Sequence, residues 1–284
     1  MIFIKRYPVL FFLSAAIVIT YAAGIVVFLV VRKIQLWAGI ELSWAGELVL
    51  KFGPSLAGIL TIALTAGGSG VRDLLRRCVQ WRGPMALYVA AIFLQPIILL
   101  LVLVLRGYGP QLQAVTIEVA ISAFAAQLLL NVFLGGGLSE ELGWRGFMLP
   151  RLCNRYSPLV ASMLVAVAWF AWHIPGYILF NKATSDPVLP FALVLFPFSI
   201  SLTWVYLCSN QSLVLPILLH GSINASFYAM EELLPGVTNA PDFQPAFDWW
   251  LAGIWCVLGV VVVAKWRSVF GRSPEQRPLE IRAR

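Results

Sequence analysis

The chain has 284 residues, of which 60% are hydrophobic and 12% charged, and its formal net charge is +7. A soluble domain usually carries about twice this share of charged residues, roughly 25%. The composition therefore excludes an ordinary soluble enzyme, a disordered chain and a nucleic-acid-binding module, and apolar segments become the unit for counting elements.

Eight apolar segments are candidate transmembrane helices, which need about 20 mostly apolar residues. In chain order they are Pro8–Val31, Gly53–Ala66, Met85–Leu105, Ala114–Leu134, Pro158–Leu179, Val188–Leu207, Leu213–Met230 and Trp249–Ala264. The first exceeds the roughly 7–15 apolar residues of a signal-peptide core, so we expect it to be retained as an anchor. The pattern predicts an all-α, polytopic integral membrane bundle of about eight helices, formed by one domain over residues 1–270.

The basic residues indicate the orientation, because cytoplasmic loops collect Lys and Arg. The second connection, the fourth connection and the tail are basic, whereas the seventh connection is acidic. The residues concerned are Arg72, Arg76, Arg77 and Arg82; Arg145, Arg151 and Arg155; Lys265, Arg267, Arg272, Arg277, Arg282 and Arg284; and the acidic Glu231, Glu232, Asp242 and Asp248. With eight crossings, this pattern predicts that both termini are cytoplasmic. We expect a cell-membrane protein with a flexible basic cytoplasmic tail over residues 271–284.

Ionisable residues within apolar segments are costly to bury and often mark functional sites. The chain has only two histidines. His173 lies in AWFAWHIPGY and His220 in LPILLHGSINAS, and a cluster of charged residues begins at Glu140 in GGGLSEELGWRG. These three places hold most of the ionisable chemistry that we expect inside the membrane domain.

The glycine run before Glu140 predicts a break in the fourth apolar segment. Ser139 would then be the N-cap of a new helix that continues to about Tyr156. The next helix would begin at Pro158, preceded by a serine cap. The two helices would form an antiparallel hairpin.

In this hairpin, Glu140 lies about 16 residues before the turn and His173 about 16 after it, each ~25 Å along its helix. We therefore expect the two side chains to face each other at one level. His220 and Asn224 are four residues apart and share one helical face. All four could converge on a polar cavity that opens toward the cytoplasm.

Each polar residue also has a purely structural interpretation. Glu141 and Arg145 have opposite charges at i and i+4, which favours an ion pair that stabilises the helix. Glu140 lies on a different face and has no cation at i+3 or i+4, which suits a general base. A histidine in a helix is usually a packing residue, but two that both align with Glu140 point to function. Asn224 could instead cross-link helices, and we expect Trp169 to pack beside His173.

The polar residues form a set that resembles the CPBP family of intramembrane proteases. This family includes the CAAX prenyl endopeptidases and bacterial bacteriocin-processing and abortive-infection proteins. The motifs that carry the resemblance are Glu140-Glu141-x-x-x-Arg145, an aromatic-x-x-x-His173, and His220-x-x-x-Asn224. The resemblance covers residues 114–230, the expected catalytic core. The second motif usually begins with Phe, and Trp169 occupies that position here.

The resemblance implies an intramembrane endopeptidase of the glutamate type that needs no cofactor. Glu140 and His173 would activate a water for attack on a peptide carbonyl, and His220 and Asn224 would donate hydrogen bonds to the oxyanion. The neighbouring ion pair would hold the Glu140 helix in place. The expected partners are membrane lipids and hydrophobic, membrane-associated peptides or proteins, prenylated ones among them, and no nucleic acid.

Two alternatives remain open at this point. Glu140, His173 and His220 could be ligands of a catalytic zinc ion with an open fourth position. The sequence contains no HExxH motif, and Asn224 is better explained as an oxyanion donor, so we favour the metal-free mechanism. Alternatively, the chain could be a transporter or a non-proteolytic scaffold of the same fold, with its polar residues along a proton or solute path.

Overall fold

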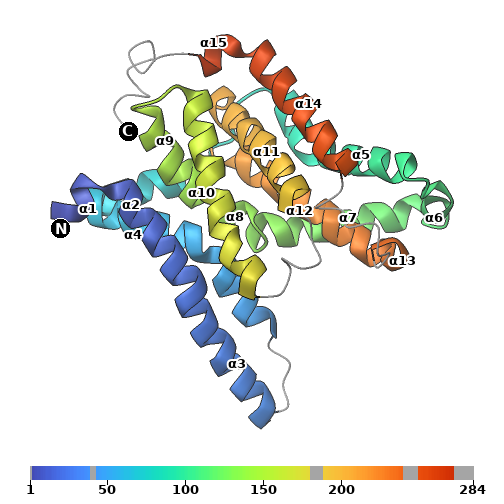
Figure 1. Ribbon diagram of the computed structural model, residues 1–284, viewed down its shortest axis with the longest axis horizontal. Coiled ribbons are helices and arrows are strands. Elements are labelled where there is room, and N and C mark those ends of the chain that lie inside the picture. The colour runs from blue at the N-terminus through green and yellow to red at the C-terminus, as the bar shows by residue number, and fades with distance from the viewer. Residues whose placement is uncertain (1, 39–42, 180–187, 239–248, 272–284) are drawn as a thin grey trace.

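The computed structural model describes residues 2–38, 43–179, 188–238 and 249–271, and every regular element in these ranges is helical (Figure 1). The prediction of an all-α protein is confirmed. The elements are α1 (Ile2–Arg6), α2 (Pro8–Ile17), η1 (Val18–Ala23), α3 (Gly24–Ala38), α4 (Ser43–Arg77), α5 (Met85–Leu105), α6 (Gly109–Gln113), α7 (Ile117–Phe133), α8 (Gly137–Gly143), η2 (Trp144–Met148), α9 (Leu149–Cys153), α10 (Pro158–Leu179), α11 (Val188–Cys208), α12 (Val214–Leu233), α13 (Pro235–Thr238), α14 (Trp249–Lys265) and α15 (Arg267–Phe270). The elements η1 and η2 are π-helical turns.

Six helical segments in the described part of the chain are long and apolar enough to cross a membrane. They are Pro8–Ile34, Leu50–Arg77, Met85–Leu105, Ile117–Cys153, Pro158–Gly176 and Val188–Cys208. The apolar helix α14 is shorter, and the more polar α12 is not among the six. The chain thus has the build of a multi-pass membrane protein. Eight crossings and cytoplasmic termini stay predictions, and the predicted tail from residue 272 onward lies outside the described residues.

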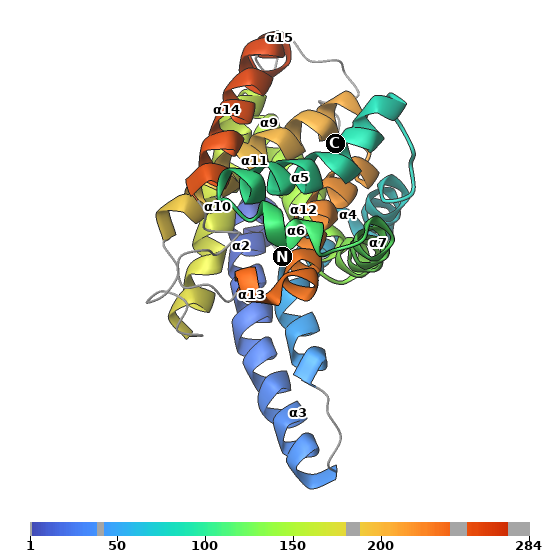
Figure 2. The ribbon, with the colours of Figure 1, turned by 90° about the vertical axis from the view of Figure 1, so that its right-hand side faces the viewer.

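Helix α3 and the first part of α4 form an arm that projects from the rest of the molecule (Figures 1 and 2). Helices α2 and α3 are joined without a loop by η1, and the first part of α4 runs beside α3 (Figures 1 and 2). The second predicted segment, Gly53–Ala66, is too short, because α4 extends from Ser43 to Arg77. Its predicted end nevertheless marks a real feature, since the backbone of Gly67 is non-helical, with φ 68°.

The predicted break at the glycine run is present between α7 and α8. Gly136 has φ 114°, a conformation that side chains rarely allow, so a residue without Cβ is needed there. The new helix begins at Gly137, not after an N-cap at Ser139 as predicted. Ser139 lies in the first turn, and its Oγ accepts a hydrogen bond from the backbone N–H of Gly136 at 2.8 Å.

The new segment is helical without a gap as far as Cys153, three residues short of the predicted end at about Tyr156, but it is not α-helical throughout. Helix α8 ends at Gly143, the π-helical turn η2 follows, and α9 ends at Cys153. A π turn bonds i to i+5, and such turns frequently occur at functional sites. The extra residue in the turn changes the helical face on which the following side chains lie.

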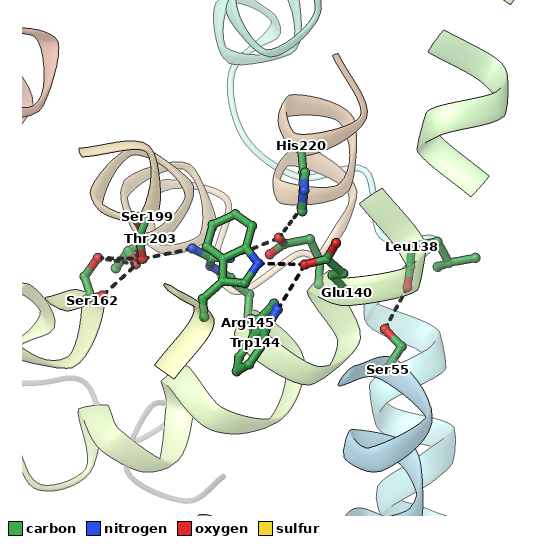
Figure 3. A network of polar contacts seen from close by, with 11 residues as sticks. Ser55, Leu138, Glu140, Trp144, Arg145, Ser162, Ser199, Thr203 and His220 are labelled. Carbon is green, nitrogen blue, oxygen red and sulfur yellow. Dashed lines mark hydrogen bonds and ion pairs between the residues drawn. The ribbon is translucent and has the colours of Figure 1, made fainter. Parts of the chain in front are cut away.

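Helix α8 lies in the interior, in contact with α4, α7 and α12. Small residues allow α4 to approach closely: a Cβ on Gly58 would lie 2.9 Å from the Cα of Gly143. Ser55 of α4 donates a hydrogen bond to the backbone oxygen of Leu138 at 2.8 Å (Figure 3). Because neighbouring helices hold α8 on several sides, its polar side chains are held in a rigid, buried setting.

Candidate functional site

Glu140 lies on α8 and is only 6% exposed. Its Oε2 accepts hydrogen bonds from two indole N–H groups, that of Trp169 at 2.7 Å and that of Trp144 at 3.3 Å. Trp144 follows Glu140 by four residues in the chain, whereas Trp169 comes from α10. Glu140 was predicted to have no cation beside it, and the structure shows which neutral donors take that place (Figure 3).

The predicted ion pair between Glu141 and Arg145 is present and completely buried. Arg145 Nη1 lies 3.0 Å from Glu141 Oε1. The same Oε1 lies 2.7 Å from His220 Nδ1, a contact that the sequence did not predict. Because an ionised carboxylate only accepts hydrogen bonds, Nδ1 of His220 is the donor. Glu141 therefore orients His220 as well as pairing with the arginine.

Arg145 is anchored on its far side by hydroxyl groups. Its Nη2 donates to Ser199 Oγ of α11 at 3.0 Å, and Ser199 in turn donates to the backbone oxygen of Ser162 on α10 at 3.0 Å. Thr203 donates to Ser162 Oγ at 3.0 Å and completes this group (Figure 3). The buried polar network thus connects η2 to α10 and α11, and it fixes the turn that follows Glu140.

His220 and Asn224 converge beside Gly136, at the break between α7 and α8. A Cβ on Gly136 would lie 2.8 Å from His220 Nε2 and closer still to Asn224 Nδ2. Asn224 Nδ2 also donates to the backbone oxygen of Gly135. An amide NH₂ group has two hydrogens, so Asn224 keeps one for another acceptor. Because Gly136 has no side chain, a space remains beside its Cα. His220 Nε2 and Asn224 Nδ2 both border this space.

His173 is partly buried on α10, one helical turn after Trp169. Its Nδ1 lies 2.8 Å from the backbone oxygen of Trp169. A carbonyl oxygen only accepts, so Nδ1 carries the proton and Nε2 of the neutral ring is the acceptor. The ring also contacts the indole of Trp172, with centroids 4.8 Å apart.

The structure brings the predicted residues into one region around Trp169. Trp169 is the α10 residue that contacts Glu140. His173 contacts the backbone oxygen of Trp169 and is thereby connected to Glu140 through that residue. The predicted alignment of Glu140 with His173 assumed a continuous helix from Ser139. The helix instead begins at Gly137 and contains the π turn η2, and the level of Glu140 relative to His173 stays a prediction. Trp144 was missed, although its position four residues after Glu140 was a usable signal.

Among the described residues, no group of three or more His, Cys, Asp and Glu side chains is placed so that it could hold a metal ion. The zinc alternative, with Glu140, His173 and His220 as ligands, therefore has no assembled ligand set in this part of the chain. One imidazole nitrogen of each histidine is already bound, His220 to Glu141 and His173 to a backbone carbonyl. Metal dependence stays a question for experiment.

These features define a class: a helical membrane protein with a site of one carboxylate held by two indole donors, two imidazoles and a carboxamide. Comparison with known proteins narrows the class. The family model described as Type II CAAX prenyl endopeptidase Rce1-like matches residues 121–226, which include α8, α10 and the polar part of α12. The predicted resemblance to the CPBP family is thus confirmed.

A named relative agrees with the family match. The chain is 36% identical over 104 residues to CAAX prenyl protease 2 of Methanococcus maripaludis. The aligned segment covers 34% of this chain and 38% of that relative. The similarity therefore concerns the region of the site, and the rest of the two proteins is not aligned.

Proposed function

We propose that the chain is an intramembrane endopeptidase that cleaves hydrophobic, membrane-associated substrates, prenylated peptides among them. The observation that carries the proposal is the arrangement around the break between α7 and α8. There a buried carboxylate, Glu140, lies near two nitrogen groups that point to one place beside Gly136. The match to CAAX prenyl endopeptidases supports the same activity and adds the prenylated substrate class.

In the proposed reaction, Glu140 is the general base. Its Oε2 is occupied by the two indole N–H groups, which leaves Oε1 to accept a proton from water. His173 offers Nε2 as a second acceptor that orients the same water. The hydroxide attacks the carbonyl carbon of the scissile bond, and the C=O π electrons move onto its oxygen.

The oxyanion would be stabilised beside Gly136 by His220 and the free amide hydrogen of Asn224. His220 donates Nδ1–H to Glu141, so it must also carry a proton on Nε2 to donate to the oxyanion. A doubly protonated His220 makes chemical sense here, because it balances the buried charges: two carboxylates then face one guanidinium and one imidazolium. Collapse of the intermediate breaks the C–N bond, and the amine leaves with the proton held by Glu140.

We further propose that the site opens toward the cytoplasm of a cell membrane, since the basic connections before α5 and after α9 lie on the same side in the predicted topology. A transporter or scaffold would need no base and no oxyanion donors at one place. The clustering of both favours hydrolysis, and no observation in the described residues favours transport more.

The decisive experiment is peptide cleavage by purified, membrane-reconstituted protein across matched peptides with and without a prenyl group. Glu140→Ala should lower kcat by about 10²–10⁴-fold, the usual contribution of a general base. Glu231→Ala, which removes an exposed carboxylate of α12 outside the site, should cleave like the wild type. Full cleavage by Glu140→Ala would remove the protease assignment.

The metal question needs a separate measurement. Metal analysis of the purified protein, together with cleavage before and after chelation, distinguishes the two mechanisms. The glutamate mechanism predicts unchanged activity after chelation. Stoichiometric zinc, with activity lost on chelation and restored by zinc, would refute it.

A further inference from the structure

Trp169 touches every charged or reactive group of the site except Asn224 and Glu141. Its indole N–H donates to Glu140 Oε2, and its backbone oxygen accepts from His173 Nδ1. Its ring lies edge-on to the ring of His220, with centroids 5.1 Å apart, and under the guanidinium of Arg145, whose Cζ is 4.8 Å from the ring centroid. With an exposure of 3%, Trp169 is a central, buried member of the site.

The two indole donors to Glu140 are not equivalent. The N–O distance of 2.7 Å to Trp169 is in the range of charge-assisted hydrogen bonds, and the 3.3 Å distance to Trp144 is long. Trp144 belongs to the same helical segment as Glu140 and moves with it. Trp169 comes from α10 and can therefore fix the carboxylate relative to the histidine on that helix.

An indole N–H is a donor that never accepts. It can hold one oxygen of Glu140 without competing for the proton of the water. A phenylalanine at this position would fill much of the space and pack on the same rings, but it has no donor. The N–H group is thus what distinguishes the indole chemically from a purely packing aromatic ring.

We propose that Trp169 is a positioning residue for the general base: its N–H fixes Glu140 Oε2, directs Oε1 toward the water, and ties the carboxylate to His173 through one residue of α10. This inference rests on the proposed peptidase function, in which Glu140 is the base. It adds a role that goes beyond the packing expected of an aromatic residue at this position.

The first test is kinetic and uses Trp169→Phe, which retains an aromatic ring and removes the N–H. Loss of one hydrogen bond to a charged group should lower kcat by about 10–100-fold. KM should change little, because the indole N–H is bound to Glu140 and has no proposed role in holding the substrate. The probe is a farnesylated peptide cleaved by the full chain in liposomes.

The matched control is Trp255→Phe. Trp255 is completely buried on α14, and its N–H donates to Gln95 Oε1 at 3.1 Å, outside the site. The control loses the same atoms in an equally buried setting, so it measures the general effect of removing a buried indole. We expect it to retain the wild-type kcat.

The second test observes the hydrogen bond directly. In protein labelled with ¹⁵N at tryptophan, the Trp169 indole signal is identified by its absence from Trp169→Phe. Its proton should resonate downfield in the wild type and shift upfield in Glu140→Ala, while the Trp255 signal stays in place. This readout does not require activity. If Trp169→Phe fails to fold, Trp169→Tyr identifies the signal. The comparison of wild type with Glu140→Ala then still tests the hydrogen bond.

The outcomes separate the two proposals. If Trp169→Phe retains the kcat of Trp255→Phe while Glu140→Ala is inactive, the positioning role is refuted and the peptidase proposal stands. If Glu140→Ala cleaves normally, the proposed function fails and the positioning role fails with it. An indole signal that does not respond to Glu140→Ala would also overturn the inference.

Discussion

The sharpest perturbation of the proposed oxyanion site is Gly136→Ala, because it adds one carbon atom where two donors converge. The Cβ would lie 2.8 Å from His220 Nε2 and closer still to Asn224 Nδ2. Ordinary contact between such atoms begins near ~3.5 Å, so His220 would have to retreat by roughly 0.7 Å. Such a displacement would weaken the hydrogen bond that His220 donates to the oxyanion, because hydrogen bonds are sensitive to distance and angle.

The expected cost follows from the geometry. Removing one oxyanion donor typically lowers kcat by about 10²–10³-fold, so displacement of both should cause at least that loss. Alanine at φ 114° also costs about 1–3 kcal/mol of stability. Activity and stability should therefore both fall, and a control is needed that shares the strain but not the collision.

Gly107→Ala is that control. Gly107 also has positive φ, 83°, and a Cβ there would meet no atom within 4 Å among the described residues. Thermal unfolding in detergent should show a loss of stability in both variants. Cleavage rates in liposomes should show a loss of kcat in Gly136→Ala only. Equal kcat values for the two variants would refute the assignment of His220 and Asn224 as oxyanion donors.

Two further predictions concern the buried ion pair. Arg145→Met should lower the free energy of unfolding by about 3–5 kcal/mol, because it removes the guanidinium partner of the buried Glu141; Arg155→Met, at an exposed position, should not, and equal unfolding of the two would contradict the reasoning. Glu141→Gln should lower kcat about tenfold or more, because the hydrogen bond from His220 Nδ1 then goes to a neutral amide oxygen in place of a carboxylate; a variant that folds and retains the wild-type kcat would show that the charge of Glu141 does not act through His220.

Several elements were predictable because their signals are local. The bounds predicted for α5 and α10 agree with the structure to the residue, since each is an apolar run that begins at or directly after a proline. The Glu141–Arg145 pair was predictable for the same reason, because i and i+4 are neighbours on any helix. Gly67 and Gly136 interrupt helices where the sequence indicated a short or broken segment.

Other features depend on how helices pack and have no local signal. His220 and Glu141 are 79 residues apart, and only the contact between α12 and α8 brings them within 2.7 Å. The start of α8 was misplaced by three residues because serine favours an N-cap but is also accepted in a first turn. No sequence pattern indicates the π turn η2, which changes the helical faces of the residues after Gly143.

The sequence by itself determined that this is an all-helical membrane protein and which few ionisable residues could do chemistry in it. Scarcity made that possible: burying charge in an apolar protein is costly, so the residues that remain inside are informative. The tertiary structure alone decided their partners. It placed the Trp169 indole on Glu140, Glu141 on His220, and two nitrogen groups beside the bare Cα of Gly136. Hydrogen bonds require correct placement to within a few tenths of an ångström, and only the packing of helices from distant parts of the chain provides it.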